Sequence, residues 1–343
     1  MSAAEREEID KILEGLALAV AESDSIEHEK ATNFGEVKIQ KLVYMAADEF
    51  DIPITYSWYL AGAECKSPNV SAMNYEGKYE TVSPDTIDNT QFIDNQRSYS
   101  AEADVRRYAG YFKREFNLAQ DVLFESRTSF LDDFYEEYSP ARFAQVYKHS
   151  LSLRMLLRKT ISQLQEYVES SGGGTAQAGL SAFGQEQRIS APDHYAEVQK
   201  ITSEIHLSMG ADEDLKETIP YFRQFTDVLE DMYLQLSKLD VRDLTEEHLS
   251  ALKDAQNTHY YHAWKVPGLV ISQETALGPE ADELRLERAR ELERHLNGYD
   301  EEIANFKERT VERGLLPDHT GFPDHDDTLD DSLEQLEREY ISD

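Results

Sequence analysis

Apolar residues recur at helical spacing along most of the chain. Within residues 2–22 the apolar positions share one helical face: Ile9, Ile12, Leu13, Leu16 and Val20. Ser2 and Glu5 fit a capping box at the start of this helix. A second helix is predicted from Val37 to Phe50, and Pro53 ends it because proline cannot continue the hydrogen-bond ladder.

A short β element follows these two helices. The stretch "ITYSWYL" is rich in β-branched and aromatic residues, so it predicts a strand that a turn at Gly62 ends. The later stretch "NYEGKYETVS" predicts a small hairpin around Glu76-Gly77, with Tyr75 and Tyr79 paired across it. We therefore expect the β structure to lie near residues 54–82.

From about residue 100 the pattern is helical almost to the end. The predicted helices cover residues 101–117, 118–137, 140–169, 193–208, 219–239, 245–264 and 280–312. Ser139 and Pro140 fit the N-cap and first position of the third of these, and Thr245 fits an N-cap further on. The stretch "KVPGLVIS", residues 265–272, predicts a break with extended backbone.

A Gly-, Ser- and Ala-rich stretch, "SSGGGTAQAGLSAFGQEQ", is typical of a flexible linker. It divides the chain into residues 1–169, the linker 170–188, a helical domain 189–314 and an acidic tail 315–343. The order helix, break, aromatic strand and hairpin is that of a winged-helix unit. The fold class predicted is therefore mainly α, with a winged-helix-like N-terminal module and a small β-hairpin, followed by a helical bundle.

Acidic residues exceed basic residues by a wide margin. Asp and Glu total 68 against 34 Lys and Arg, which gives a formal net charge of −34 over 343 residues. Such self-repulsion disfavours a compact state unless salt screens it. We therefore expect a protein of a salty cytoplasm, that of a halophilic archaeon. An acidic protein that mimics or binds a basic partner is the alternative.

The remaining bulk features also favour a cytoplasmic location. A single cysteine, Cys65, excludes an internal disulfide framework. The N-terminal stretch lacks the basic region of a signal peptide. No stretch of the sequence has the roughly 18 uncharged apolar residues of a membrane span.

Residues 141–165 contain no acidic residue, although acids are spread along the rest of the chain. The bases of this helix are Arg142, Lys148, Arg154, Arg158 and Lys159. One interpretation is a buried central helix whose bases pair with acids of neighbouring helices. The other is a contact surface for a partner or a nucleic acid, with Arg142, Lys148, Arg158 and Lys159 as the binding residues. Phosphate contacts weaken steeply as salt rises, so a salty cytoplasm disfavours DNA held by these bases alone.

Candidate catalytic residues are few. His259 and His262 in "HYYH" are three residues apart on a predicted helix, where they either bind a metal with a third ligand or form a half-buried, hydrogen-bonded pair. Cys65 precedes Lys66, and a lowered thiol pKa would make it reactive, but no signature marks it as a nucleophile. Walker A, GxGxxG and GxSxG motifs are absent from the sequence. We therefore expect no enzyme, no bound metal and no cofactor.

Residues 38–68 carry the pattern "KIQKLVYMA" followed by "SWYLAGA". This segment resembles the Panacea-type antitoxin and phage-associated protein family. The matching positions are Lys38, Lys41, Leu42, Tyr44, Ala46, Trp58, Tyr59 and Gly62. Ala63 stands where the family carries proline, and "ECKSP" replaces the start of the next helix. The resemblance implies a small, mainly helical, winged-helix-like module that binds partners rather than catalyses a reaction.

These observations together predict a non-enzymatic interaction or regulatory protein. It would recognise a protein partner through its N-terminal module, in the setting of a mobile element or host defence. The C-terminal helices would provide docking or homo-oligomerisation. A winged-helix DNA-binding regulator and a metal-dependent enzyme using His259 and His262 are the alternatives.

Overall fold

Helices make up most of the residues that the computed structural model describes, which are 2–22, 35–65, 103–116, 126–172, 191–240 and 243–316. A two-stranded antiparallel hairpin near the N-terminus is the sheet found in this part of the chain. The mainly helical fold with a small hairpin is therefore confirmed. Within the described ranges, no helix is both long and apolar enough to cross a membrane.

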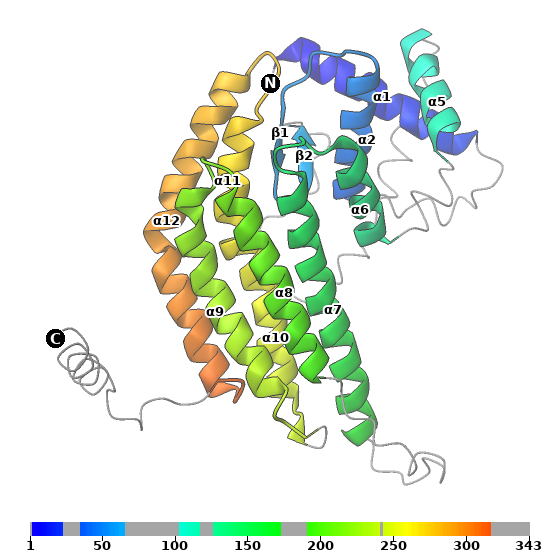
Figure 1. Cartoon of the computed structure of the whole chain (residues 1–343). Coiled ribbons are helices and arrows are strands. Elements are labelled where there is room, and N and C mark those ends of the chain that lie inside the picture. Colours follow the sequence, from blue (N-terminus) through cyan, green and yellow to red (C-terminus); the bar gives the residue numbers. More distant parts are fainter. Residues whose placement is uncertain are drawn as a thin grey trace, which may run out of the picture.

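The C-terminal helices lie side by side in an elongated bundle (Figure 1). They are α7 (Ala144–Gly172), α8 (Ala191–Gly210), α9 (Ile219–Leu236), α10 (Glu246–Thr258), α11 (Lys265–Glu274) and α12 (Ala281–Glu312). A 3-10 turn (Lys216–Thr218) precedes α9, and a π-helix (His259–Ala263) joins α10 to α11. Helices α7 and α8 pack against each other although the predicted linker separates them in sequence.

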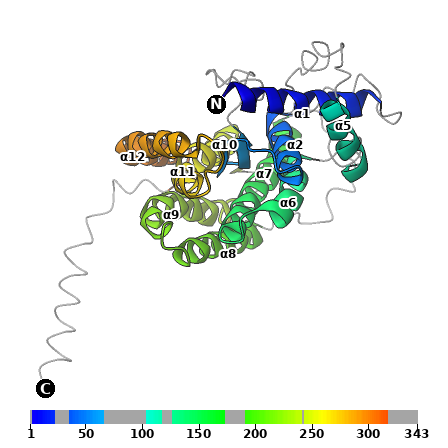
Figure 2. The same cartoon turned by 90° about the horizontal axis from the view of Figure 1, so that it is seen from above.

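The N-terminal elements gather at one end of this bundle. They are α1 (Ala3–Ala21), α2 (Glu36–Glu49), β1 (Tyr56–Tyr59), β2 (Gly62–Cys65), α5 (Ala103–Glu115) and α6 (Arg127–Tyr138). Figure 2 shows α1 lengthwise along one edge, with the bundle helices seen nearly end-on. Helix α5 packs on α1, and α6 packs on α7. Buried apolar side chains from both halves of the chain form a continuous cluster.

The capping box predicted for α1 is present, and its glutamate also binds the segment before β1. The Ser2 hydroxyl accepts from the Glu5 backbone N–H, and the Glu5 carboxylate accepts from the Ser2 N–H. The same carboxylate accepts from the Thr55 N–H at 2.8 Å and the Thr55 hydroxyl at 2.5 Å. Burial would raise the pKa of Glu5, but the bonds from Thr55 and Ser2 hold it below its usual value. The helix start thereby fixes the segment that leads into β1.

The hairpin joins β1 to β2 through a two-residue turn at Leu60-Ala61. Tyr56 pairs with Cys65 at its open end, and Tyr59 pairs with Gly62 beside the turn. Gly62 therefore begins the second strand rather than forming the turn itself. It has a positive φ of 91°, and a Cβ there would lie 2.9 Å from the Tyr135 ring. The hairpin predicted around Glu76-Gly77 lies outside the described residues.

The tip of the hairpin is packed against the bundle. The Tyr147 hydroxyl donates to the Tyr59 carbonyl at 2.6 Å, and the Trp264 indole N–H donates to the Leu60 carbonyl at 2.8 Å. Near the other end of β1, Tyr56 exchanges two backbone hydrogen bonds with Leu277, which follows α11. The hairpin is thus held at both ends by C-terminal residues.

Two local predictions were wrong. Residues 265–272, predicted as extended, belong to α11, because Pro267 lies in the first turn of that helix, where a missing N–H costs nothing. Ser139 does not cap α7. It is the C-cap of α6, where its hydroxyl donates to the Tyr135 carbonyl, and a turn over residues 140–143 precedes α7.

The domain limits stay predictions. One observation concerns the limit predicted at residue 314, between the helical domain and the acidic tail. Leu315 and Leu316 are buried in the core, so ordered packing reaches two residues into the stretch assigned to the acidic tail. Residues 173–190 and 317–343 lie outside the described residues.

A glycine in the turn between α11 and α12 generates a stability prediction. Gly278 has a φ of 101°, and a Cβ there would lie 2.3 Å from the Ile54 carbonyl oxygen and 2.6 Å from the Thr55 Cα. We expect Gly278→Ala to lower the free energy of unfolding by roughly 3 kcal/mol, because neither the backbone at Gly278 nor that at Ile54 and Thr55 can move away from the added Cβ without cost. Denaturant unfolding measures this. The control Gly298→Ala, with nothing within 4 Å, should be neutral or stabilising by about 1 kcal/mol. Equal effects in the two variants would contradict the close approach.

Candidate functional site

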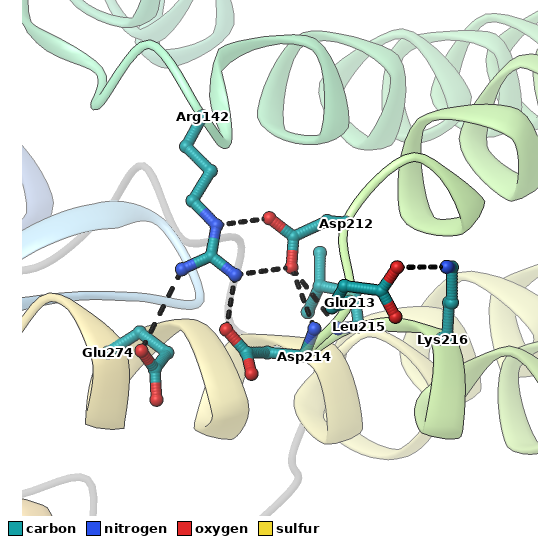
Figure 3. Close-up of polar contacts among 7 residues, drawn as sticks. All are labelled: Arg142, Asp212, Glu213, Asp214, Leu215, Lys216 and Glu274. Carbon is teal, nitrogen blue, oxygen red and sulfur yellow. Dashed lines mark hydrogen bonds and ion pairs between the residues drawn. The ribbon is translucent and has the colours of Figure 1, made fainter.

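Arg142, one of the predicted binding residues, lies in an ion-pair cluster that joins three parts of the chain (Figure 3). Its Nε and Nη2 donate to the two carboxylate oxygens of Asp212, the Nη2 bond being 2.8 Å long. Nη2 also contacts Asp214, and Nη1 lies 3.7 Å from Glu274. These hydrogen bonds raise the pKa of the guanidinium. Arg142 therefore ties the start of α7 to the α8–α9 connection and the end of α11.

Asp212 is the buried member of this cluster. Its side chain is 6% exposed, and its Oδ1 also accepts from the backbone N–H groups of Asp214 and Leu215. A bidentate, partly desolvated Arg–carboxylate pair of this kind is stronger than an exposed ion pair.

The other three predicted residues are spread along α7. Lys148 lies 3.2 Å from Glu136 of α6, Arg158 is half-buried, and Lys159 is exposed. Lys148 and Arg158 are roughly 15 Å apart along the helix axis, since each residue adds about 1.5 Å. The structure thus joins Arg142 and Lys148 to acids of neighbouring elements and does not gather the four bases into one cluster. Their role in binding a partner or nucleic acid stays a prediction.

A second network lies beside β1. The Arg288 guanidinium stacks on the Tyr59 ring at 4.0 Å and lies 2.9 Å from Glu291 and 3.5 Å from Glu64. Lys265 also pairs with Glu291 at 2.9 Å. Burial would raise the pKa of Glu291, but Lys265 and Arg288 hold it below its usual value. This network joins the hairpin to α11 and α12.

A buried lysine and the single cysteine lie on the inner side of the hairpin. Lys41 of α2 donates to the Ala63 carbonyl at 2.5 Å, and burial lowers its pKa to about 8 although Glu64 opposes the change. The Cys65 N–H donates to the Gln40 side chain. Burial raises the pKa of the Cys65 thiol to about 12 despite the nearby Lys41. The lowered thiol pKa considered from the sequence is therefore wrong.

The two histidines of "HYYH" point into different surroundings. His259 is fully buried beside Phe222 and Phe225, and neither of its ring nitrogens has a partner in the described structure. Burial, with the charge of Arg154 in addition, lowers its pKa to about 3. His262 instead stacks on His295 at 5.8 Å. Over the described ranges no three His, Cys, Asp or Glu side chains are grouped to hold a metal ion.

Arg154 was not among the binding residues predicted from the sequence. This residue of α7 is 7% exposed, and its guanidinium lies 4.5 Å from the centre of the Tyr260 ring. Tyr135 of α6 is 1% exposed, and burial raises its pKa although the charge of Arg154 opposes this rise. The acid-free run contained Arg154, but the spacing alone did not distinguish it from the other bases of α7.

The Arg142 cluster generates a prediction that separates a structural role from a binding role. Arg142→Met leaves the buried Asp212 carboxylate without its bidentate partner, so we expect the free energy of unfolding to fall by roughly 2 kcal/mol. Lys159→Met, on the exposed side of α7, should change it by less than about 0.5 kcal/mol. Urea unfolding of both variants measures the difference. An Arg142 variant as stable as the parent chain would exclude the structural role.

Burial of Cys65 generates a prediction on thiol reactivity. A protonated thiol without solvent access reacts slowly with a disulfide reagent, because the thiolate is the reacting species. We expect Ellman's reagent to label almost none of the native protein within minutes and one thiol per chain after denaturation, since the sequence has one cysteine. Labelling of the native protein at the denatured rate would show that the thiol is accessible.

Comparison with known proteins places the whole chain in a single family. No curated protein and no solved structure matches the chain. The family model described as a domain of unknown function, DUF8098, matches residues 1–342, so the chain belongs to this family.

Proposed function

We propose that the protein is a non-enzymatic interaction or regulatory protein that recognises a protein partner in the cytoplasm of a halophilic archaeon. The resemblance of residues 38–68 to Panacea-type antitoxins makes a mobile element or host defence the setting of this proposal. The C-terminal helices are the proposed place of docking or self-association.

The observation that carries this proposal is where the bases of α7, and of the turn before it, lie. Arg142 and Lys148, two of the four bases proposed to contact a partner, are already paired with carboxylates of the same chain. The acids exceed the bases by 34 charges, so the net negative charge of the molecule repels phosphates. A protein partner with basic or apolar contacts fits such a molecule better than a nucleic acid does.

The packing of the hairpin supports the same choice. The β1–β2 hairpin has no free tip for contact with DNA, because the Tyr59 and Leu60 carbonyls accept hydrogen bonds from Tyr147 and Trp264. The hairpin predicted around Glu76-Gly77 lies outside the described residues, so it does not bear on this choice. The DNA-binding alternative names Lys148, Arg158 and Lys159 as the bases that would contact DNA. A metal-dependent enzyme finds no support in the separate surroundings of His259 and His262.

The test is purification of the tagged chain from its host in molar potassium chloride, with and without nuclease. We expect one protein to co-purify stoichiometrically and to remain after nuclease treatment. In parallel, the purified chain should leave the mobility of duplex DNA unchanged in a gel. Retarded DNA that returns to its free mobility with Arg158→Gln and Lys159→Gln would replace this proposal with the DNA-binding alternative. Exposed Lys200→Gln, on α8, is the control.

A further inference from the structure

His259 is an imidazole without polar surroundings. It is completely buried, and neither ring nitrogen has a hydrogen-bond partner in the part of the chain that the structure describes. Its ring lies 5.7 Å from that of Phe225 and 6.1 Å from that of Phe222, both on α9. Both nitrogens are also closed to bulk solvent. Such a site holds a neutral ring at some cost and a charged ring at a much larger one.

The charges around His259 do not favour a proton on it. Arg154 of α7 acts on this ring, and its positive charge opposes a second one. The phenylalanine rings of α9 offer no acceptor, and His206 of α8 packs on the Phe222 ring. Burial therefore lowers the pKa of His259 to about 3, and Arg154 adds to the effect. A histidine in an open chain has a pKa of about 6.5.

The neighbouring pair His262 and His295 differs in this respect. The two rings are half-buried and stack at 5.8 Å, and the His295 Nε2 lies 3.0 Å from the His262 carbonyl oxygen. Burial lowers the pKa of both rings, but carboxylates of α12 oppose the change. The charged groups that act on the pair are Lys265 of α11 and, on α12, Glu291, Glu302 and Arg309. A proton on this pair thus has carboxylates nearby, whereas a proton on His259 has none.

The π-helix connects His259 to the hairpin. The His259 carbonyl accepts from the Trp264 backbone N–H at 2.7 Å, which is the five-residue hydrogen bond of this turn. The Trp264 indole N–H donates to the Leu60 carbonyl at the hairpin tip. A π-turn holds one residue more than an α-turn, so a change to α-helical register moves His259 relative to Trp264. A displacement of His259 therefore acts on the residue that holds the tip.

We propose that His259 forms an acid-sensitive latch on the contact between the bundle and the hairpin. While its ring is neutral, it stays among the phenylalanine rings, and the π-turn holds Trp264 against Leu60. A proton on the ring creates a buried charge without a partner, so the ring leaves the core and the π-turn changes register. The indole then withdraws from the hairpin tip while the bundle helices stay formed. This latch does not depend on the proposed protein partner.

The pH range in which the latch opens is set by the pKa of His259 in its two states. This pKa is lower in the closed state than in the open one, so the closed state is fully favoured above about pH 6.5 and loses favour as the pH falls toward about 3. One such group lowers the equilibrium constant for closure by about 30-fold between roughly pH 7.5 and pH 5.

The test is urea unfolding of the full chain in molar potassium chloride at roughly pH 7.5 and pH 5, followed by tryptophan fluorescence and far-UV circular dichroism. Both tryptophans, Trp58 and Trp264, lie at the hairpin and are 1% exposed, so fluorescence reports on this contact and dichroism on the helices. We expect coincident transitions at the higher pH. At the lower pH the fluorescence transition should occur at a lower urea concentration than the dichroism transition.

Variants of His259 separate the latch from general acid instability. His259→Phe keeps a ring and removes the titrating group, so its two transitions should coincide at both pH values whatever its overall stability. His259→Leu serves the same purpose with a smaller side chain. The control His149→Gln replaces a half-buried histidine of α7 that lies 3.4 Å from Glu204, and it should behave as the parent chain does. Coincident transitions of the parent at the lower pH would overturn the proposal.

Amide hydrogen exchange, corrected for its intrinsic dependence on pH, measures the size of the effect. We expect the protection of β1, β2 and the π-helix to fall about 30-fold between roughly pH 7.5 and pH 5 in the parent chain. In His259→Phe it should change by less than about threefold. Equal losses in the two chains would show that another group controls the opening and would overturn the proposal.

Discussion

The structure depends on how the hairpin tip is bound by the C-terminal helices. A two-stranded hairpin is marginally stable by itself, because it cannot bury its apolar side chains or satisfy all its backbone groups. Here the carbonyls of Tyr59 and Leu60 accept from the hydroxyl of Tyr147 and the indole of Trp264. Trp58, at 1% exposure, packs on Tyr147 at 5.3 Å. The hairpin therefore serves as the joint between the two halves of the chain.

Because bases are few, the ion pairs that they form matter for holding the acidic elements together. In a chain with 68 acids and 34 bases, neighbouring acidic helices repel unless a base lies between them. Arg142 joins α7 to the α8–α9 connection, and Arg288 joins the hairpin to α12. Arg309 of α12 and Arg313, the C-cap of this helix, both bind Asp254 of α10. These four bases therefore act as links between elements.

The sequence predicted what depends on local pattern. Helices other than α11 follow apolar spacing, and the caps at Ser2 and Thr245 follow from side chains that bond to the next turn. Residues 265–272 were missed because proline and glycine usually break helices, whereas here Pro267 falls in the first turn. The pairing of Arg142 with Asp212 spans 70 residues, and no local pattern encodes such a contact.

The candidate site was predictable only in part for the same reason. The acid-free run indicated that α7 is unusual, and it correctly contained Arg154. Whether a base on a helix faces solvent, an acid or an aromatic ring depends on the neighbours that the fold supplies. Tyr260 comes from the π-helix and Tyr135 from α6, so neither could be assigned to Arg154 from spacing on α7.

Tyr135 connects α6 to the joint between the two halves of the chain. Its ring lies 5.1 Å from that of Tyr147, the residue that bonds to the hairpin tip, and 6.2 Å from Trp58. Tyr147 in turn meets Trp264 at 5.5 Å. Packed aromatic rings transmit displacement because an interior at this density has little free volume. A change at any of these rings would therefore alter the contact that holds the hairpin, so α6 and α7 act on the hairpin through packing as well as through hydrogen bonds.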